Sequence, residues 1–341
     1  MKAIVLSATL ALCVGFGLVP VAAQPLGPAP ITVEAGSGCA SPVMGETCSP
    51  ALCYMAGETT DSCWSVNAAG LLLHRSTARA ATLARAGASQ QELTNVADLD
   101  LGFAAGPRID LTRRFCCDWG LGVTYFGIDS WNASRALADT GNLEVPFVSS
   151  NPADRFDTAN ASYSSRLYST EINLKRPWLE GLDVLAGFRW VELHERLAGE
   201  AFGQNLWGDA QVRTNNHLYG FQLGLEGRLW DCGGPFQLDG FLKAGIYGNS
   251  MAASLVAHGT DLDMEGSGTF HRTSFLGELG LTASYCLNRH WSIFAGYEVM
   301  WLDGVGLAGD SIAALDAVDS DLMQNGSAFY HGVLVGTQFN W

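Results

Sequence analysis

The fold is decided by the stretch AFYHGVLVGTQFNW, residues 328–341. Counted back from Trp341, every second side chain forms a mainly apolar and aromatic face: Trp341, Phe339, Thr337, Val335, Val333, His331 and Phe329. The residues between them are mainly small or polar: Asn340, Gln338, Gly336, Leu334 and Gly332. This period of two predicts a β-strand, because successive strand side chains point to opposite faces. The stretch has no following element to cover its apolar face.

The same alternation recurs in nine other segments of about ten to seventeen residues. They cover residues 65–74, 98–111, 119–127, 165–175, 182–193, 217–230, 236–249, 275–286 and 291–301. With the last stretch, the sequence predicts about ten strands. A soluble sandwich also alternates, so the period alone leaves two fold classes open.

The links between these segments separate the two classes. Four links are short, at residues 113–118, 176–181, 231–235 and 287–290. The others are long and rich in Asp, Asn, Ser and Gly, at roughly residues 76–97, 129–162, 196–212, 251–268 and 303–327. Strict alternation of short and long links indicates an all-β, up-and-down transmembrane barrel with short periplasmic turns and long extracellular loops. Because hydrocarbon offers backbone groups no hydrogen-bond partners, such a sheet must close, and lipid then covers its outer face.

The N-terminus predicts export. Lys2 precedes an apolar run that ends at Val21-Ala22-Ala23, which matches a secretory signal with cleavage after residue 23. We therefore expect three parts: a signal peptide at 1–23, a Cys-rich periplasmic segment at 24–65 and a transmembrane barrel at 66–341. No later apolar run approaches the roughly 20 residues of a spanning helix.

Composition restricts the partners. Only 16% of the residues are charged, which is low for a soluble surface, and the net charge is -15. This net charge argues against nucleic acid and against anionic lipid headgroups. We expect outer-membrane lipids around the barrel, small ions or solutes as other partners, and no cofactor; the sequence does not predict the oligomeric state.

Four stretches carry a family resemblance: LNRHWSIFAGYEVMWLDGVGLA at 287–308, SRLYSTEINLKR at 165–176, LDVLAGFRWVELHERL at 182–197 and NNHLYGFQLGLEGRLW at 215–230. The chain resembles the seventh family of beta-barrel porins over most of residues 66–341. The resemblance implies an outer-membrane barrel and offers no catalytic residues to carry over.

Eight cysteines remain after the predicted cleavage, and the topology places all of them on the periplasmic side: Cys39, Cys48, Cys53, Cys63, Cys116, Cys117, Cys232 and Cys286. An even count in an oxidising compartment favours disulfides. Two bridges within residues 39–63 and bridges that involve the turns are the alternatives. Zinc binding is disfavoured because no C-x-x-C spacing occurs.

Charged residues alternate with the apolar face and are predicted to point into the lumen: Asp100, Arg108, Asp110, Glu171, Lys175, Asp183, Arg189, Glu226, Arg228, Asp239, Lys243, Glu278 and Glu298. Eight strands enclose only side chains, whereas open channels need sixteen or more. Ten strands therefore predict a narrow interior that ion pairs largely fill, with a slim path of weak cation preference as the pore alternative.

Histidines and carboxylates gather near the predicted outer rim: His74, His194, His217, His258, His271 and His331, with Glu192, Glu195, Asp261, Asp263 and Glu265. Such groups would activate water in a rim hydrolase or bind a divalent ion, or they simply hydrate the loops. We favour hydration and assign no catalytic or metal-binding residue. The sequence thus predicts a structural or narrow pore barrel, with a rim hydrolase and a surface binding or adhesion platform as the alternatives.

Overall fold

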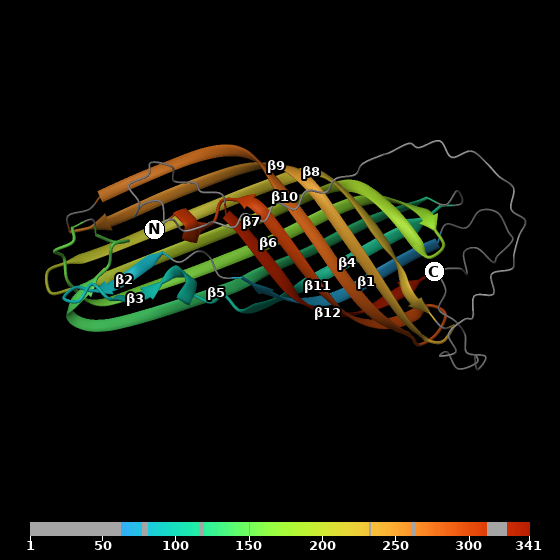
Figure 1. The fold of residues 1–341 in the computed structure, drawn as a ribbon, viewed down its shortest axis with the longest axis horizontal. Helices are drawn as coiled ribbons and strands as arrows, with labels where there is room; N and C mark the ends of the chain where they lie inside the picture. The colour runs from blue at the N-terminus through green and yellow to red at the C-terminus, as the bar shows by residue number, and fades with distance from the viewer. Residues whose placement is uncertain are drawn as a thin grey trace, which may run out of the picture. The chain divides into compact units, whose positions relative to one another are not determined.

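The computed structural model describes residues 63–76, 81–115, 119–149, 151–231, 233–260, 263–311 and 326–341. These residues form one antiparallel sheet (Figure 1). Its first strands are β1 Cys63–Arg75, β2 Thr82–Ala86, β3 Glu92–Asn95, β4 Phe103–Arg114, β5 Gly120–Glu144 and β6 Phe156–Leu179, with a 3-10 turn η1 at Val96–Asp98. The others are β7 Leu182–Phe202, β8 Trp207–Asp231, β9 Phe236–Gly259, β10 Asp263–Cys286, β11 Trp291–Val305 and β12 Gly326–Asn340.

Ten of these strands close into a ring. Each long strand pairs with its neighbour in the chain, and β1 pairs with both β4 and β12. At the seam, the backbone amide of Trp64 donates to the oxygen of Trp341 at 2.9 Å, and the amide of Trp341 donates to Trp64 at 3.0 Å. The predicted up-and-down barrel of ten strands is confirmed. The last stretch of sequence, in β12, therefore pairs with the first strand, β1.

The outer face of the ring carries an apolar belt. Phe221 is 77% exposed, Leu223 69% and Ile246 66%, although each lies in the middle of a strand. A continuous apolar surface of this extent is found where lipid covers it. Aromatic rings mark the periplasmic edge of the belt. There Trp64 stacks on Trp341 with 6.2 Å between the ring centroids, and the ring centroids of Trp291 and Phe339 are 4.8 Å apart.

Strands β5 to β10 run far beyond this belt, and here the sequence misplaced the strand ends. Most of residues 129–162, 196–212 and 251–268 were expected as loops. Instead they extend the strands, so that β5 runs to Glu144, β7 to Phe202 and β9 to Gly259. The outward side chains of the extensions are mainly polar because water, not lipid, surrounds them. The apolar alternation therefore ends while the strands continue. The short links from β4 to β5, β6 to β7, β8 to β9 and β10 to β11 lie where predicted, as the ends of these strands show.

The interior of the extended part is filled, mainly by apolar side chains. Trp131, Leu193 and Leu197 are fully buried there, and the indole nitrogen of Trp131 donates to the carbonyl of Leu73 at 3.0 Å. Residues 306–311, which follow β11, are buried with them. The extension is therefore a packed plug above the membrane level.

No helix among the described residues is long and apolar enough to cross a membrane. The barrel begins at Cys63, so the predicted signal peptide and nearly all of the Cys-rich segment lie outside the described residues.

Candidate functional site

Three close ion pairs cross the lumen at the level of the apolar belt, and Arg108 also lies 3.7 Å from Glu278. Arg108 Nη1 lies 2.7 Å from Glu298 Oε2, and Lys243 Nζ lies 3.0 Å from Glu171 Oε1. Arg189 pairs with Glu278. Each pair joins two strands that are not neighbours in the ring: β4 with β11, β9 with β6, and β7 with β10. We call these six residues the lumen layer.

The lumen layer is almost dry. Its most exposed member, Arg108, is 6% exposed, and Arg189 is fully buried. Uncharged groups supply further hydrogen bonds to it, because unpaired polar groups are costly in such surroundings. Asn173 Nδ2 donates to Glu171 at 2.8 Å, and Arg189 Nε donates to Ser169 Oγ at 2.8 Å. The layer therefore links strands that lie three places apart around the ring.

The charges of the lumen layer balance, since three cations face three carboxylates. Asp110 lies at its edge, where its Oδ2 is 3.4 Å from Arg108 Nε and its Oδ1 accepts a hydrogen bond from Thr124. An excess of carboxylates in the lumen was the reason to expect weak cation preference. The lumen layer has no such excess.

Three further ion pairs lie nearer the periplasmic turns. The distances are 2.6 Å for Arg114 to Asp183, 2.6 Å for Lys175 to Glu226 and 3.2 Å for Arg228 to Asp239. These pairs, unlike the lumen layer, are partly exposed.

Asp100 was predicted to face the lumen, and that prediction is wrong. Its side chain is 65% exposed, and its carboxylate lies 3.7 Å from the outward ring of His74. Asp100 lies before β4, and Gly102, whose φ is +60°, lies between Asp100 and the first residue of that strand. Counting alternate residues across that glycine gives the wrong face.

At the outer rim, the structure brings Glu192, His194 and His217 together on the outside of the barrel. Glu192 Oε1 lies 3.2 Å from His217 Nδ1, and Glu192 Oε2 lies 3.6 Å from His194 Nε2. Spacing along the chain does not predict this contact, which follows from the register that sets Glu192 opposite His217. Among the described residues, no group of three or more His, Cys, Asp and Glu side chains is arranged to hold a metal ion.

Glu195 does not belong to the rim set, contrary to expectation. Its side chain is fully buried and pairs with Arg75, while Tyr163 donates to its Oε2 at 2.6 Å. The backbone amide of Ala308 donates to the same oxygen at 2.9 Å. Glu195 has the opposite parity to Glu192 and His194 on β7, so it points inward.

The remaining rim residues are spread over the barrel. His74 stacks on His331 at 5.0 Å, and His258 Nδ1 lies 2.9 Å from Asp263. His271 and Glu265 lie on β10, whereas Asp261 lies outside the described residues.

Two asparagines that the sequence analysis missed hold the end of β11 and the residue after it inside the barrel. Asn216 exchanges two hydrogen bonds of 2.8 Å with the backbone of Gly306, and Asn249 donates to Gly304 at 3.3 Å. Both asparagines are at most 2% exposed. Their inward parity in β8 and β9 was the available signal.

Most of the cysteines lie outside the described residues: Cys39, Cys48, Cys53, Cys116, Cys117 and Cys232. Cys63 begins β1, and Cys286 ends β10 and is disulfide-bonded. The pairing scheme stays a prediction.

A family model described as "Putative beta barrel porin-7 (BBP7)" matches residues 89–338. The chain belongs to this family. The match agrees with the resemblance in the sequence and supports an outer-membrane barrel, while it assigns no catalytic residue to this BBP7 member. No curated protein matches the chain.

Solved structures of other barrels resemble the BBP7 chain only distantly. The outer membrane protease OmpT from Escherichia coli is 12% identical with a TM-score of 0.46, over 83% of this chain and 99% of that one. The translocator domain of the autotransporter NalP from Neisseria meningitidis is 10% identical with a TM-score of 0.37, over 85% and 91%. Neisserial surface protein A is 13% identical with a TM-score of 0.29, over 81% and 96%. Likenesses at this level carry no conclusion about activity.

Proposed function

We propose that this BBP7 barrel is a structural protein of the outer membrane whose lumen is closed to bulk diffusion. The observation that carries the proposal is the lumen layer, in which Arg189 and Glu278 meet across the barrel without exposed surface. The apolar plug above it adds a second obstruction on the same path. Ten strands are also too few for an open aqueous channel.

The balanced charge of the lumen layer is a further reason to favour a closed barrel over a selective pore. A cation path would require carboxylates that face water, whereas Glu171 is 1% exposed and Glu278 is 3% exposed. Both carboxylates already have cationic partners. An ion would have to separate a buried pair to pass, which costs several kcal/mol, on the order of 3–5.

Conductance in planar bilayers tests this function. We expect the purified full-length protein to insert without producing stepwise currents. Insertion should be checked in the same preparation by protection of the barrel from protease. Reproducible unitary currents from the inserted wild-type protein would contradict the proposal.

A variant pair shows whether the assay detects an opened lumen. Arg189→Ser together with Glu278→Ser removes one ion pair of the lumen layer completely, and Arg228→Ser together with Asp239→Ser removes a partly exposed pair near the periplasmic turns. We expect the first double variant to admit more current than the second, because only the first breaks the dry layer.

Two alternatives remain proposals of lower rank. A rim hydrolase would use His194 and His217, which lie together with Glu192, but the same strand directs Glu195 into the core. Loss of a peptidase or esterase activity in His194→Ala or His217→Ala would favour it. A binding or adhesion platform would use the hairpins beyond the belt.

The route to the membrane belongs to the same proposal. Residues 1–23 are proposed to direct export and to be cleaved, and residues 24–62 to stay in the periplasm with their cysteines paired. N-terminal sequencing of the mature protein tests the cleavage, and a thiol count under denaturing conditions tests the pairing.

A further inference from the structure

An arginine patch lies on the outside of the barrel, just beyond the apolar belt. It consists of Arg166 on β6, Arg196 on β7 and Arg213 on β8, and all three side chains are exposed. Arg166 is the cross-strand neighbour of His194, and Arg196 that of Arg213. Their parity places them on the same face as the belt residues Trp190 and Tyr219.

The arginine patch is electrostatically unfavourable when no partner is bound to it. Residues directly opposite in an antiparallel pair have Cβ atoms about 4.5–5.5 Å apart, and like charges there are destabilising. Within the described ranges, none of the three arginines takes part in an ion pair. Arg213 only donates a 3.4 Å hydrogen bond to Gln211. In a chain with 34 acidic and 19 basic residues, unpaired arginines side by side indicate an anionic partner.

The height of the patch indicates where that partner comes from. Along β7, the outward residues run from Phe188 and Trp190 in the belt through Glu192 and His194 to Arg196. The outward residues of β8 follow the same order: Phe221 and Tyr219 lie in the belt, and Arg213 lies beyond it. Aromatic belts mark the boundary between hydrocarbon and headgroups, so the arginines lie at the level of lipid headgroups.

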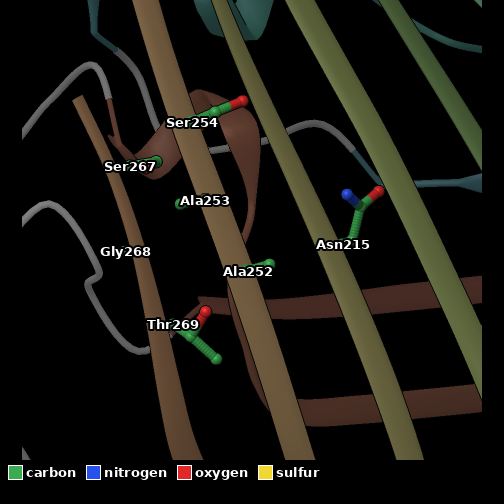
Figure 2. A pocket seen from close by; sticks show the side chains of 7 residues that line it. All are labelled: Asn215, Ala252, Ala253, Ser254, Ser267, Gly268 and Thr269. Carbon is green, nitrogen blue, oxygen red and sulfur yellow. The ribbon is translucent and has the colours of Figure 1, made fainter. Parts of the chain in front are cut away.

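A hollow adjoins the patch on the same wall. It has a volume of about 430 Å³ and is lined by Asn215, Ala252, Ala253, Ser254, Ser267, Gly268 and Thr269 (Figure 2). Ser254 is the cross-strand neighbour of Arg213. Asn215 contacts His194, with 2.8 Å between Oδ1 and Nδ1. Small side chains make the space, and hydroxyl and amide groups give it hydrogen-bonding partners suited to a sugar.

We infer that the arginine patch and this hollow form a binding site for the phosphorylated sugar headgroup of a glycolipid in the outer leaflet. The phosphate would lie between Arg196 and Arg213, where guanidinium groups bind it through paired hydrogen bonds. The sugar would occupy the hollow, and the acyl chains would lie along Trp190 and Phe221. The net charge of -15 argues against anionic headgroups over the whole surface, but this patch is a local exception below the acidic residues Glu200 and Asp209.

Binding of diphosphoryl lipid A to the full-length protein in detergent micelles tests the inference. We expect saturable binding that Arg196→Gln with Arg213→Gln weakens about thirtyfold, at roughly one kcal/mol for each cation near a membrane surface. Ser254→Trp, which fills the hollow and keeps every charge, should also weaken binding. Arg135→Gln is the matched control, since Arg135 is exposed on the extension of β5 but lies near Asp98 at 3.9 Å.

Competition identifies the source of the phosphate. Inorganic phosphate and phosphatidylglycerol should displace lipid A poorly, because neither fills the hollow. Equal competition by either one would overturn the inference, as would wild-type affinity in both the arginine and the Ser254→Trp variants. If Arg135→Gln weakened binding to the same extent, the loss would reflect overall charge and not the arginine patch, and this result would also overturn the inference. None of these outcomes depends on whether the lumen conducts.

Discussion

Glu195 and Glu200 show at the scale of single residues how parity decides what a carboxylate does. Both lie on β7, but Glu195 points inward to Arg75 and Tyr163, and Glu200 points outward to water. Glu195 also accepts a hydrogen bond from the backbone of Ala308. Glu195 therefore compensates the buried guanidinium of Arg75, and it also holds the segment after β11 in place.

Replacement of Glu195 should destabilise the barrel strongly. Glu195→Ala leaves the charge of Arg75 buried and uncompensated, so we expect the free energy of unfolding to fall by about 3–5 kcal/mol. Glu200→Ala, on the exposed face of the same strand, should change it by no more than about 0.5 kcal/mol. Urea titration in lipid vesicles, followed by tryptophan fluorescence, measures both. Similar urea midpoints for the two variants would mean that the buried charge of Arg75 does not need Glu195 to compensate it.

The seam between β1 and β12 is the element on which closure depends. A Cβ at Gly332 of β12 would overlap the carbonyl oxygen of Leu72, whereas a Cβ at Gly70 of β1 would meet nothing within 4 Å. Both glycines lie inside paired strands. The backbones approach so closely at Gly332 that only glycine fits without a shift of the ladder.

Alanine at these two glycines should therefore have opposite effects. Gly332→Ala forces the seam apart and should cost about 1–3 kcal/mol. Gly70→Ala should be neutral or stabilising by up to about 1 kcal/mol, because alanine loses less conformational freedom on folding. The temperature at which the folded band on an SDS gel shifts to the unfolded position compares the variants. A lower transition for Gly70→Ala than for Gly332→Ala would contradict this account of the seam.

The same elements show what the sequence predicts and where prediction stops. Strand number, turn positions and closure follow from apolar alternation, because lipid selects an apolar outer face wherever it touches a strand. Outside lipid that selection ends, so the extensions of β6 and β7 read as loops although Tyr163 and Leu197 continue the inward pattern. Partners across the lumen, such as Arg189 with Glu278, depend on the three-dimensional closure of strands that are not adjacent, and alternation contains no such information.

At the scale of the whole molecule, the barrel divides into a lower part that contacts lipid and an upper part that contacts water. The division is visible along the outward face of β7, where Ala186 lies among belt residues and Ala198 lies beyond the arginine patch. At about 3.4 Å per residue, the two alanines are roughly 40 Å apart along the strand. That distance exceeds the apolar band of about 25 Å in barrels of this kind, so one residue of the pair must lie outside it.

A charge introduced at each alanine locates the membrane on the molecule. Ala186→Arg places a guanidinium in hydrocarbon and should destabilise the barrel folded in vesicles by about 2–4 kcal/mol, whereas Ala198→Arg should destabilise it by about 0–1 kcal/mol. Both substitutions add the same side chain to the same face of the same strand, so propensity and net charge cancel in the comparison. Folding into phosphatidylcholine vesicles under a urea gradient gives the two values. If the two variants lost stability equally, lipid would have to reach the upper part of the barrel, and the arginine patch would lie too deep to meet a headgroup.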